Sequence, residues 1–242
     1  MSGSERSEQK SLGLTFRSIY ETLAISWPTV LDAALGRVSK DVCDDRLESW
    51  GRKIAEHTRA VLEIRGREHL APGKTYLVMS NHQSHYDVPL LFHVIGKNIR
   101  MITKQELFKI PIFGKAMLEA GFISIDRENR QSAMRSLKLA KEKMEAGTHV
   151  WIAPEGTRSR TGALGPFKKG GFALAMDAGL MILPVTIDGT RNILVAQGVR
   201  SIPGAHVTIT FHAPIDASAF PRGKAGREKL MADVRAAIQS GF

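Results

Sequence analysis

From residue 61 to the C-terminus, the sequence alternates short β-rich runs with segments of helical periodicity. The predicted strands lie at 61–66, 75–80, 99–103, 122–126, 149–153, 181–188 and 206–211. The predicted helices lie at 87–95, 112–119, 130–146, 169–178 and 225–240. This alternation is typical of α/β domains, so we expect a mixed, largely parallel central sheet with helices on both faces.

An amphipathic helical segment precedes the predicted sheet. Its apolar residues recur at three- and four-residue spacing and are Phe16, Ile19, Leu23, Trp27, Val30, Leu31, Ala34, Leu35 and Val38. Pro28 predicts a break that splits the segment into two helices. A further helix at 44–60 places Leu47, Trp50, Ile54 and Thr58 on one side. Two interpretations stay open: a helical pair packed on the core, or an anchor at a membrane interface, where Trp and Tyr beside Arg and Lys are favoured.

We therefore divide the chain into a disordered tail at 1–12, amphipathic helices at 13–60 and one α/β domain at 61–242. The polar tail lacks the order of charges and apolar residues that marks a signal peptide. The single cysteine, Cys43, excludes an intrachain disulfide and a multi-cysteine zinc site, and it suits a reducing compartment. No apolar run reaches the roughly 18 to 20 residues that cross a bilayer. We expect a chain that does not span a membrane.

The formal net charge of +10 predicts a polyanionic partner, either nucleic acid, anionic lipid or a phosphorylated substrate. Nucleic-acid binders usually show a recognisable module or basic residues interleaved with exposed aromatics. Neither is visible in this chain, whose aromatic content is 7%. We expect no nucleic-acid partner.

The stretch "NHQSHYD", Asn81 to Asp87, follows the predicted strand at 75–80. Binding and catalytic groups gather at the carboxyl ends of parallel strands. A metal site would use His82, His85 and Asp87, but histidines three residues apart are less usual for zinc than histidines four apart. A catalytic dyad would use His82 as general base and Asp87 to fix its tautomer, with a helix beginning near Pro89 to bring them together. We favour the dyad and expect no metal.

The dyad has no evident protein nucleophile to activate. The chain contains no Gly-x-Ser-x-Gly motif, and Cys43 lies in a predicted helix without an obvious partner. We infer that the substrate supplies the attacking group, most simply a hydroxyl. Lys104, Arg127 and Arg158 follow other predicted strands and together predict a phosphate on that substrate.

The sequence resembles the glycerolipid acyltransferase family, typified by 1-acyl-sn-glycerol-3-phosphate acyltransferases. The family's His-x₄-Asp block matches "NHQSHYD", and its later blocks match "KQELFKIPIFG", "GFISIDR", "EGTRS" and "MILPVTIDG", in the family's order. Together these blocks cover about residues 60 to 215. A single block would be a weak signal, whereas the ordered set is highly specific.

The resemblance implies a role for each matched residue. His82 would deprotonate the acceptor hydroxyl, Asp87 would orient His82, and His85 occupies an unspecified position of the motif. The remaining implied roles are as follows: Asn81 and Ser84 support the turn, Lys104, Arg127 and Arg158 hold the acceptor phosphate, Glu155, Gly156 and Thr157 shape the pocket, and Pro184 lines the acyl path. The acyl donor would be acyl-coenzyme A or acyl-carrier protein, which is a substrate, so no cofactor is expected.

The leading functional hypothesis is acyl transfer to lysophosphatidic acid, giving phosphatidic acid. Another lysolipid, a lyso-ornithine lipid, or a small alcohol or amine is the alternative acceptor, and a non-catalytic lipid-binding module is the alternative from another class. Many relatives begin with a strongly hydrophobic segment, whereas residues 13–60 are amphipathic and interrupted by charge. We therefore expect a peripheral or monotopic protein on the cytoplasmic face of an anionic membrane.

Overall fold

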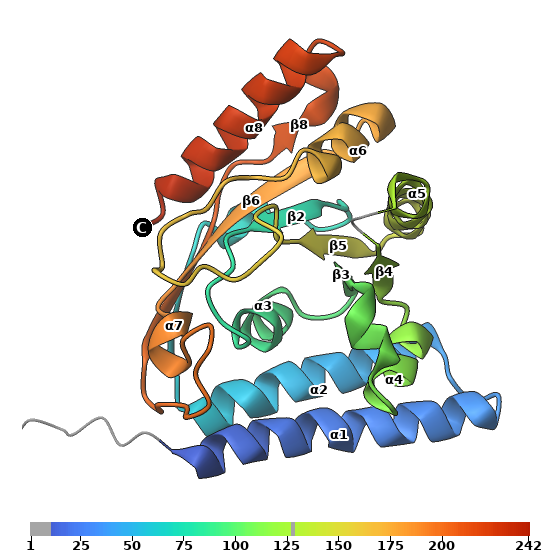
Figure 1. The fold of residues 1–242 in the computed structure, drawn as a ribbon, viewed down its shortest axis with the longest axis vertical. Helices are drawn as coiled ribbons and strands as arrows, with labels where there is room; N and C mark the ends of the chain where they lie inside the picture. The colour runs from blue at the N-terminus through green and yellow to red at the C-terminus, as the bar shows by residue number, and fades with distance from the viewer. Residues whose placement is uncertain (1–10, 127–128) are drawn as a thin grey trace, which may run out of the picture.

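The computed structural model describes residues 11–126 and 129–242 (Figure 1). Their strands form one sheet in the order β1–β7–β6–β2–β5–β3–β4, and β8 also pairs with β6. The strands are β1 Val61–Arg65, β2 Leu77–Ser80, β3 Ile99–Lys104, β4 Ile123–Ile125, β5 His149–Ile152, β6 Met181–Asp188, β7 His206–Phe211 and β8 Ile215–Asp216. Only the pairs β6–β7 and β6–β8 are antiparallel among the described strands. The predicted mixed, largely parallel sheet is confirmed.

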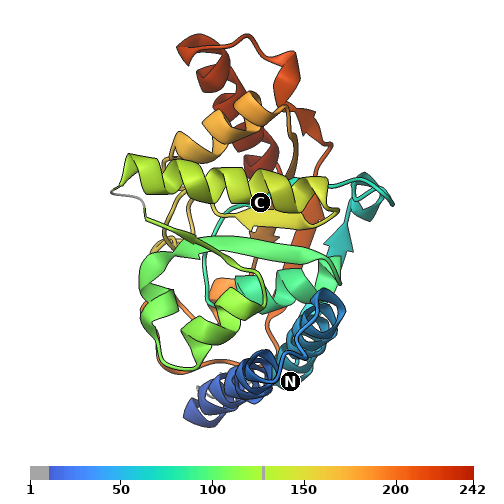
Figure 2. The same cartoon turned by 90° about the vertical axis from the view of Figure 1, so that its right-hand side faces the viewer.

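Helices cover both faces of this sheet, as Figures 1 and 2 show. One side carries α1 Leu12–Ala34, α2 Lys40–Thr58, α3 Asp87–Ile95 and α4 Phe113–Glu119. The other side carries α5 Arg130–Glu145, α6 Gly170–Ala178 and α8 Lys224–Gln239. The described chain also has a short α7, Thr190–Ile193, and three 3₁₀ turns, Arg67–His69, Gln105–Lys109 and Ala217–Ala219. The α/β prediction is correct in class, and the predicted helices of the sheet domain agree with the observed ones to within one residue at each end.

The period-two alternation of the strands divides the core between the two sheet faces. On β2, Leu77 and Met79 belong to the cluster beneath α5, α6 and α8, whereas Val78 belongs to the cluster beneath α2 and α3. All three side chains are fully buried. Because β2 is covered on both faces and lies between β5 and β6, the turn that follows it starts from a rigid position.

The predicted helix break at Pro28 is wrong, because α1 runs unbroken from Leu12 to Ala34 with Pro28 inside it. A proline removes one backbone donor from the helix ladder. Packing along α2 and α4 keeps the helix intact through this defect. The expected helix at 44–60 also begins earlier, at Lys40, because Ser39 accepts a hydrogen bond from the N–H of Val42 and caps it.

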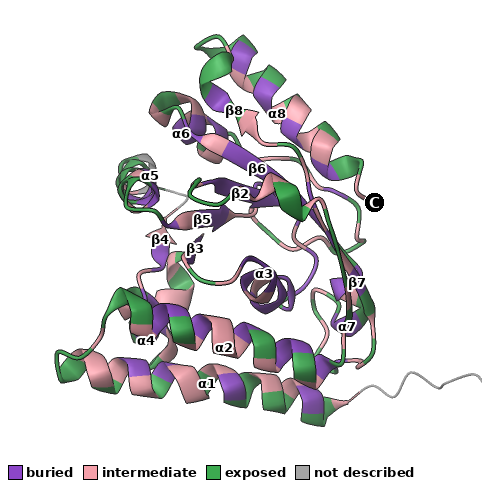
Figure 3. Cartoon of the chain, turned by 180° about the vertical axis from the view of Figure 1, so that it is seen from behind, coloured by how far each residue is buried: buried purple, intermediate pink, exposed green. Residues whose placement is uncertain are grey.

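The inward side of α1 carries four hydroxyl groups together with Leu14 and Ile25, while most of its large apolar residues face away from the protein. The hydroxyls of Ser18, Thr22, Ser26 and Thr29 each donate to a carbonyl one turn earlier. Figure 3 shows exposed residues along the length of α1. The large apolar residues Leu12, Phe16, Ile19, Tyr20, Leu23, Trp27, Leu31 and Leu35 are all exposed. The helical pair therefore packs on the core: α2 does so through its predicted side, with Leu47, Ile54 and Thr58 buried, whereas α1 does not use the apolar face that the sequence pattern suggested. We call these eight residues the outer apolar face of α1.

No helix of the described chain combines the length and the apolar character that crossing a membrane requires.

Candidate active site

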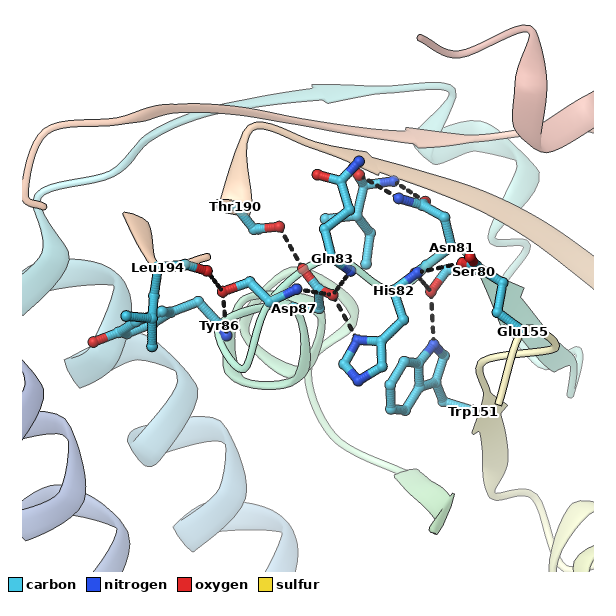
Figure 4. Close-up of polar contacts among 12 residues, drawn as sticks. Ser80, Asn81, His82, Gln83, Tyr86, Asp87, Trp151, Glu155, Thr190 and Leu194 are labelled. Atoms are coloured by element: carbon cyan, nitrogen blue, oxygen red, sulfur yellow. Dashed lines mark hydrogen bonds and ion pairs between the residues drawn. The ribbon is translucent and has the colours of Figure 1, made fainter. Parts of the chain in front are cut away.

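The stretch Asn81 to Tyr86 forms the turn between β2 and α3. Ser80 ends the central strand and Asp87 is the first residue of the helix, so the predicted strand–turn–helix arrangement is confirmed. Figure 4 shows the polar contacts of this turn. The turn lies at the carboxyl end of β2, with β5 on one side and β6 on the other. In sheets of this kind, the carboxyl ends of the strands are where ligands bind.

The structure brings His82 and Asp87 into direct contact. Nδ1 of His82 lies 2.6 Å from Oδ2 of Asp87, and the Asp87 side chain is fully buried. Because a carboxylate can only accept, the proton of the neutral imidazole sits on Nδ1 and Nε2 keeps its lone pair. The pair therefore has the arrangement of a general base with its orienting carboxylate.

Three further donors hold the Asp87 carboxylate in place. The backbone N–H groups of Gln83 and Ser84 donate to Oδ2 at 2.6 Å and 2.9 Å, and the Thr190 hydroxyl donates to Oδ1. The residue also lies at the N-terminus of α3, where the helix dipole favours negative charge. Sequence reasoning missed Thr190, because no local signal links two residues 103 positions apart.

Asn81 and Ser84 brace the turn from inside the protein. The Asn81 side chain donates to the carbonyl of Ile187 and accepts from its N–H, at 2.7 Å and 2.8 Å. The Ser84 hydroxyl donates to the carbonyl of Leu194 at 2.7 Å. Both residues are buried, and the contacts found tie them to protein backbone. This placement agrees with the supporting role implied for both residues. It gives no support for a direct contact between either side chain and a substrate.

The Glu155 side chain also contacts the turn rather than pointing into a substrate pocket. Its Oε1 accepts the backbone N–H of His82 at 3.0 Å, and its Oε2 accepts the N–H of Gly165 at 2.7 Å. Burial raises the pKa of the Glu155 carboxyl, while its hydrogen bonds and the nearby His82 and Arg235 act in the opposite direction. The carboxylate thus clamps the catalytic turn to the loop at 154–168, which we call the clamp loop.

Trp151 is a second residue that sequence reasoning missed. Its ring meets the His82 imidazole edge to face, with centroids 5.6 Å apart. Its indole N–H donates to the hydroxyl of Ser80 at 2.9 Å, which fixes the ring. The only signal in the sequence is its position in β5, the strand that precedes the "PEGTRS" motif.

The clamp loop forms one wall beside His82. The Ser159 N–H donates to the His82 carbonyl at 2.7 Å, and Nε2 of Gln83 donates to the Gly162 carbonyl at 3.2 Å. Gly156 has φ +74°, in the region that favours glycine, and Thr157 beside it is exposed. Gly156 and Thr157 therefore belong to the clamp loop beside His82, and their predicted role in shaping the pocket stays a prediction.

Two of the three predicted phosphate-binding cations lie near the dyad. Arg158 is half-buried, desolvation lowers the pKa of its guanidinium, and the charge of Asp87 acts against that shift. Lys104 ends β3 and is exposed. Among the ion pairs of residues 11–126 and 129–242, none joins Arg158 or Lys104 to a protein carboxylate. The third, Arg127, lies outside the described residues.

His85 does not join the dyad. The residue is partly open to solvent, but surrounding atoms desolvate its imidazole, and this desolvation together with the charge of Arg158 lowers its pKa to about 4. The described chain holds no group of three or more His, Cys, Asp or Glu side chains placed to bind a metal. Asp87 already accepts hydrogen bonds from several protein donors, so a metal would have to displace them.

An apolar cavity of about 50 Å³ lies among α1, α2, α3 and α4. Its lining includes Ile25, Leu47, Trp50, Val88 and Met117. Val88 directly follows Asp87, which brings one side of the cavity close to the catalytic turn. Pro184 is not in this lining but lies buried on β6, in register with Met79 of β2. The implied contact of Pro184 with an acyl chain stays a prediction.

A histidine–carboxylate pair at the carboxyl edge of a mixed α/β sheet is thus the defining feature of the molecule. The chain belongs to the acyltransferase family, whose sequence profile matches residues 61–188. The resemblance predicted from the motifs is confirmed.

Relatives and solved structures agree with this assignment. The chain is 37% identical over 158 residues to the chloroplastic 1-acyl-sn-glycerol-3-phosphate acyltransferase LPAT1 of Arabidopsis thaliana, covering 65% of this chain and 44% of that protein. It is 37% identical over 117 residues to the 1-acyl-sn-glycerol-3-phosphate acyltransferase of Haemophilus influenzae, covering 48% and 49%. The chain thus spans about half the length of the curated relatives it matches. A crystal structure of the 1-acyl-sn-glycerophosphate (LPA) acyltransferase PlsC from Thermotoga maritima superposes with a TM-score of 0.78 at 25% identity, covering 94% of this chain and 92% of that one.

Proposed function

We propose that the protein transfers a fatty acyl group from acyl-coenzyme A or acyl-carrier protein to the hydroxyl of a lysophospholipid. We favour lysophosphatidic acid as the acceptor and phosphatidic acid as the product, in line with the printed names of the relatives. The observation that carries the proposal is the 2.6 Å contact between Nδ1 of His82 and Oδ2 of Asp87. This contact leaves Nε2 of His82 as the free base.

The chemistry proceeds by direct attack. Nε2 of His82 takes the proton of the acceptor hydroxyl as its oxygen attacks the thioester carbonyl carbon. The carbon–sulfur bond then breaks, the ester forms, and the thiolate leaves with the proton that His82 returns. Asp87 stabilises the imidazolium that exists between these events. General-base assistance of this kind contributes about 10²- to 10⁴-fold in rate.

The acceptor phosphate would bind beside the dyad. Arg158 and Lys104 are cations near the turn. No ion pair of the described residues joins either of them to a carboxylate. An arginine can bind phosphate oxygens through two parallel hydrogen bonds, and a lysine binds them as a point charge. We assign the same role to Arg127 on the strength of the motif "GFISIDR" alone.

The proposal includes a peripheral or monotopic position on a membrane surface, because lysophospholipids lie in bilayers. The outer apolar face of α1 supports this position, since it exposes Phe16, Tyr20 and Trp27 beside Arg17. The net charge of +10 would favour an anionic surface. The apolar cavity beneath α1 offers a starting volume for the donor's acyl chain.

Thiol release from acyl-coenzyme A tests the proposed function, with mass spectrometry of the lipid product. The acceptor panel contains lysophosphatidic acid, lysophosphatidylcholine, a lyso-ornithine lipid, monoacylglycerol and glycerol. We expect release that depends on lysophosphatidic acid and yields phosphatidic acid. Release with another acceptor alone would reassign the substrate. Absence of release with every acceptor, and with acyl-carrier protein as donor, would favour a non-catalytic lipid-binding module.

A further inference from the structure

Arg235 of α8 ties the C-terminal helix to the clamp loop. Its Nη1 and Nη2 donate to the carbonyls of Gly165 and Leu164 at 2.6 Å and 2.7 Å. Its guanidinium carbon also lies 5.3 Å from the centroid of the Phe167 ring. One side chain thus fixes three neighbouring residues of the loop, and its paired donors set the orientation of two successive peptide groups.

The same loop leads directly to the catalytic turn. The N–H of Gly165 donates to Oε2 of Glu155 at 2.7 Å, and Oε1 of Glu155 accepts the N–H of His82 at 3.0 Å. A Cβ atom at Gly165 would lie 2.8 Å from Oε2 of Glu155, so glycine allows the close approach. The hydrogen bonds therefore run without a gap from the Arg235 guanidinium to the backbone of the proposed base.

We propose that Arg235 is a positioning residue for the proposed acyl transfer, acting on His82 through the Gly165 peptide and the Glu155 carboxylate. It touches neither substrate nor reacting atom in this scheme. Arg235 lies outside residues 61–188, which the family profile matches, so this contact belongs to the C-terminal helix rather than to the motif region.

The charge of Arg235 also supports this role, because it favours the ionised form of Glu155. Glu155 accepts one N–H group on each of its two oxygens, and an ionised carboxylate accepts both more strongly than a protonated carboxyl does. Burial raises the pKa of Glu155, and the backbone N–H groups of Gly165 and His82 and the Arg235 guanidinium act against this shift. Arg235 therefore orients the clamp and also favours the charge state in which the clamp works.

The first experiment compares Arg235→Ala with Lys229→Ala in the complete chain. Lys229 is a matched control, because it lies on the same helix with its ammonium 5.5 Å from the Phe220 ring, but it pairs with Asp233 and not with the clamp loop. For Arg235→Ala we expect kcat to fall about ten- to a hundred-fold, as for a misplaced catalytic group, with each KM within about two-fold of wild type. Lys229→Ala should keep the wild-type kcat. A wild-type kcat in Arg235→Ala would overturn the proposal.

Amide hydrogen exchange gives a readout that does not depend on activity. We expect the segments 80–84 and 160–168 to exchange at least about ten-fold faster in Arg235→Ala than in wild type or Lys229→Ala. Unchanged exchange in both segments would contradict the proposed positioning. If the wild-type protein transfers no acyl group, the proposed function fails, and the exchange comparison still decides the role of Arg235.

Arg235→Lys decides the question if Arg235→Ala does not fold. Lysine keeps the charge and the alkyl stem but cannot serve both carbonyls with a planar fork. We expect a loss of kcat and a rise in exchange that are both smaller than for alanine. Wild-type values of kcat and exchange in this variant would show that the bidentate contact has no positioning role.

Discussion

At the scale of single residues, the Asp87 carboxylate holds the proposed base, the backbone of its own turn and α7 together. One oxygen accepts from the imidazole and from two backbone N–H groups, and the other accepts from Thr190 on α7. An asparagine would keep the shape but would offer only one oxygen, so at least one of the donors would face an NH₂ group.

Asp87→Asn should therefore lower kcat by about 10²- to 10⁴-fold, because the imidazole loses both its tautomer control and its stabilising charge. Steady-state acyl transfer measures this effect, with circular dichroism to show that the variant is folded. Asp233→Asn, on the exposed face of α8, is the control and should behave as wild type. A kcat for Asp87→Asn within about three-fold of wild type would remove the carboxylate from the mechanism.

Arg158→Gln should raise KM for lysophosphatidic acid about ten- to a hundred-fold, because charge-assisted hydrogen bonds contribute about 1.5–3 kcal/mol. Transfer to uncharged monoacylglycerol should change little. Arg160→Gln is a control from the same loop, since the Arg160 side chain is exposed. An equal change in KM for both acceptors in Arg158→Gln would separate Arg158 from phosphate binding.

The dyad could be predicted from the sequence because His82, the turn and Asp87 lie within one short motif. Thr190, Trp151 and Arg235 could not be predicted, since each reaches the site from a different element. Their contacts depend on how α7, β5 and α8 pack, and one sequence does not reveal that packing. For the same reason Glu155 was assigned to the pocket, whereas its carboxylate accepts the backbone N–H groups of His82 and Gly165.

At the scale of elements, a buried ion pair joins α2 to the sheet. Nη1 of Arg100 on β3 donates to Oδ1 of Asp44 at 2.6 Å, and Lys40 donates to Oδ2 at 2.7 Å. The side chains of Asp44 and Arg100 are 3% and 5% exposed, so neither charge can turn to solvent if its partner is lost. Burial alone would raise the pKa of Asp44, but the hydrogen bonds from Lys40 and Arg100 outweigh it and hold this pKa below its ordinary 3.8.

Because the pKa of Asp44 is lower in the folded state than in the unfolded chain, its contribution to stability is present above pH 4 and is lost as the pH falls through the folded-state value. Asp44→Asn should therefore lower the free energy of unfolding by about 3–5 kcal/mol at pH 7, and by progressively less below about pH 4. Urea unfolding at a series of pH values measures the difference. Asp45→Asn, whose partner Lys97 is exposed, should show a much smaller effect. An Asp44→Asn effect that did not shrink in acid would contradict this assignment.

Pro28 shows where element-level prediction fails. Proline is a reliable local signal for a helix end, but α1 gains enough contact with α2 and α4 to tolerate it. The apolar spacing also predicted correctly that this segment is helical. The spacing did not determine whether the apolar face turns toward the protein or toward solvent. Only the structure shows that hydroxyl groups face the protein and that Phe16, Tyr20 and Trp27 face outward.

At the scale of the whole molecule, the outer apolar face of α1 and the net charge of +10 predict binding to anionic vesicles. The wild-type protein should float with such vesicles at moderate salt. The double variant Tyr20→Ser and Trp27→Ser should bind at least about ten-fold more weakly, because large apolar side chains contribute about 1.5–3 kcal/mol each when fully buried. Leu139→Ser on α5, an exposed apolar residue on the other side of the sheet, is the control and should bind as wild type. Absence of vesicle binding by the wild-type protein would contradict the proposed position on a membrane surface.

The α/β class could be predicted for the whole chain because strand and helix periods differ clearly along it. The strand order β1–β7–β6–β2–β5–β3–β4 could not, because β7 enters between β1 and β6 from far along the sequence. Successive side chains of β2 are buried on opposite faces of the sheet, which requires helices on both faces. The order in which the strands join the sheet depends instead on tertiary packing.

The most direct test of the central claim compares acyl transfer to lysophosphatidic acid by His82→Ala and His85→Ala. The two histidines lie three positions apart on the same turn, but only His82 contacts Asp87. We predict that His82→Ala folds and loses about 10²- to 10⁴-fold in kcat, whereas His85→Ala stays close to wild type. Near-wild-type transfer by His82→Ala would contradict the account, and equal losses in both variants with bound zinc would favour a metal site instead.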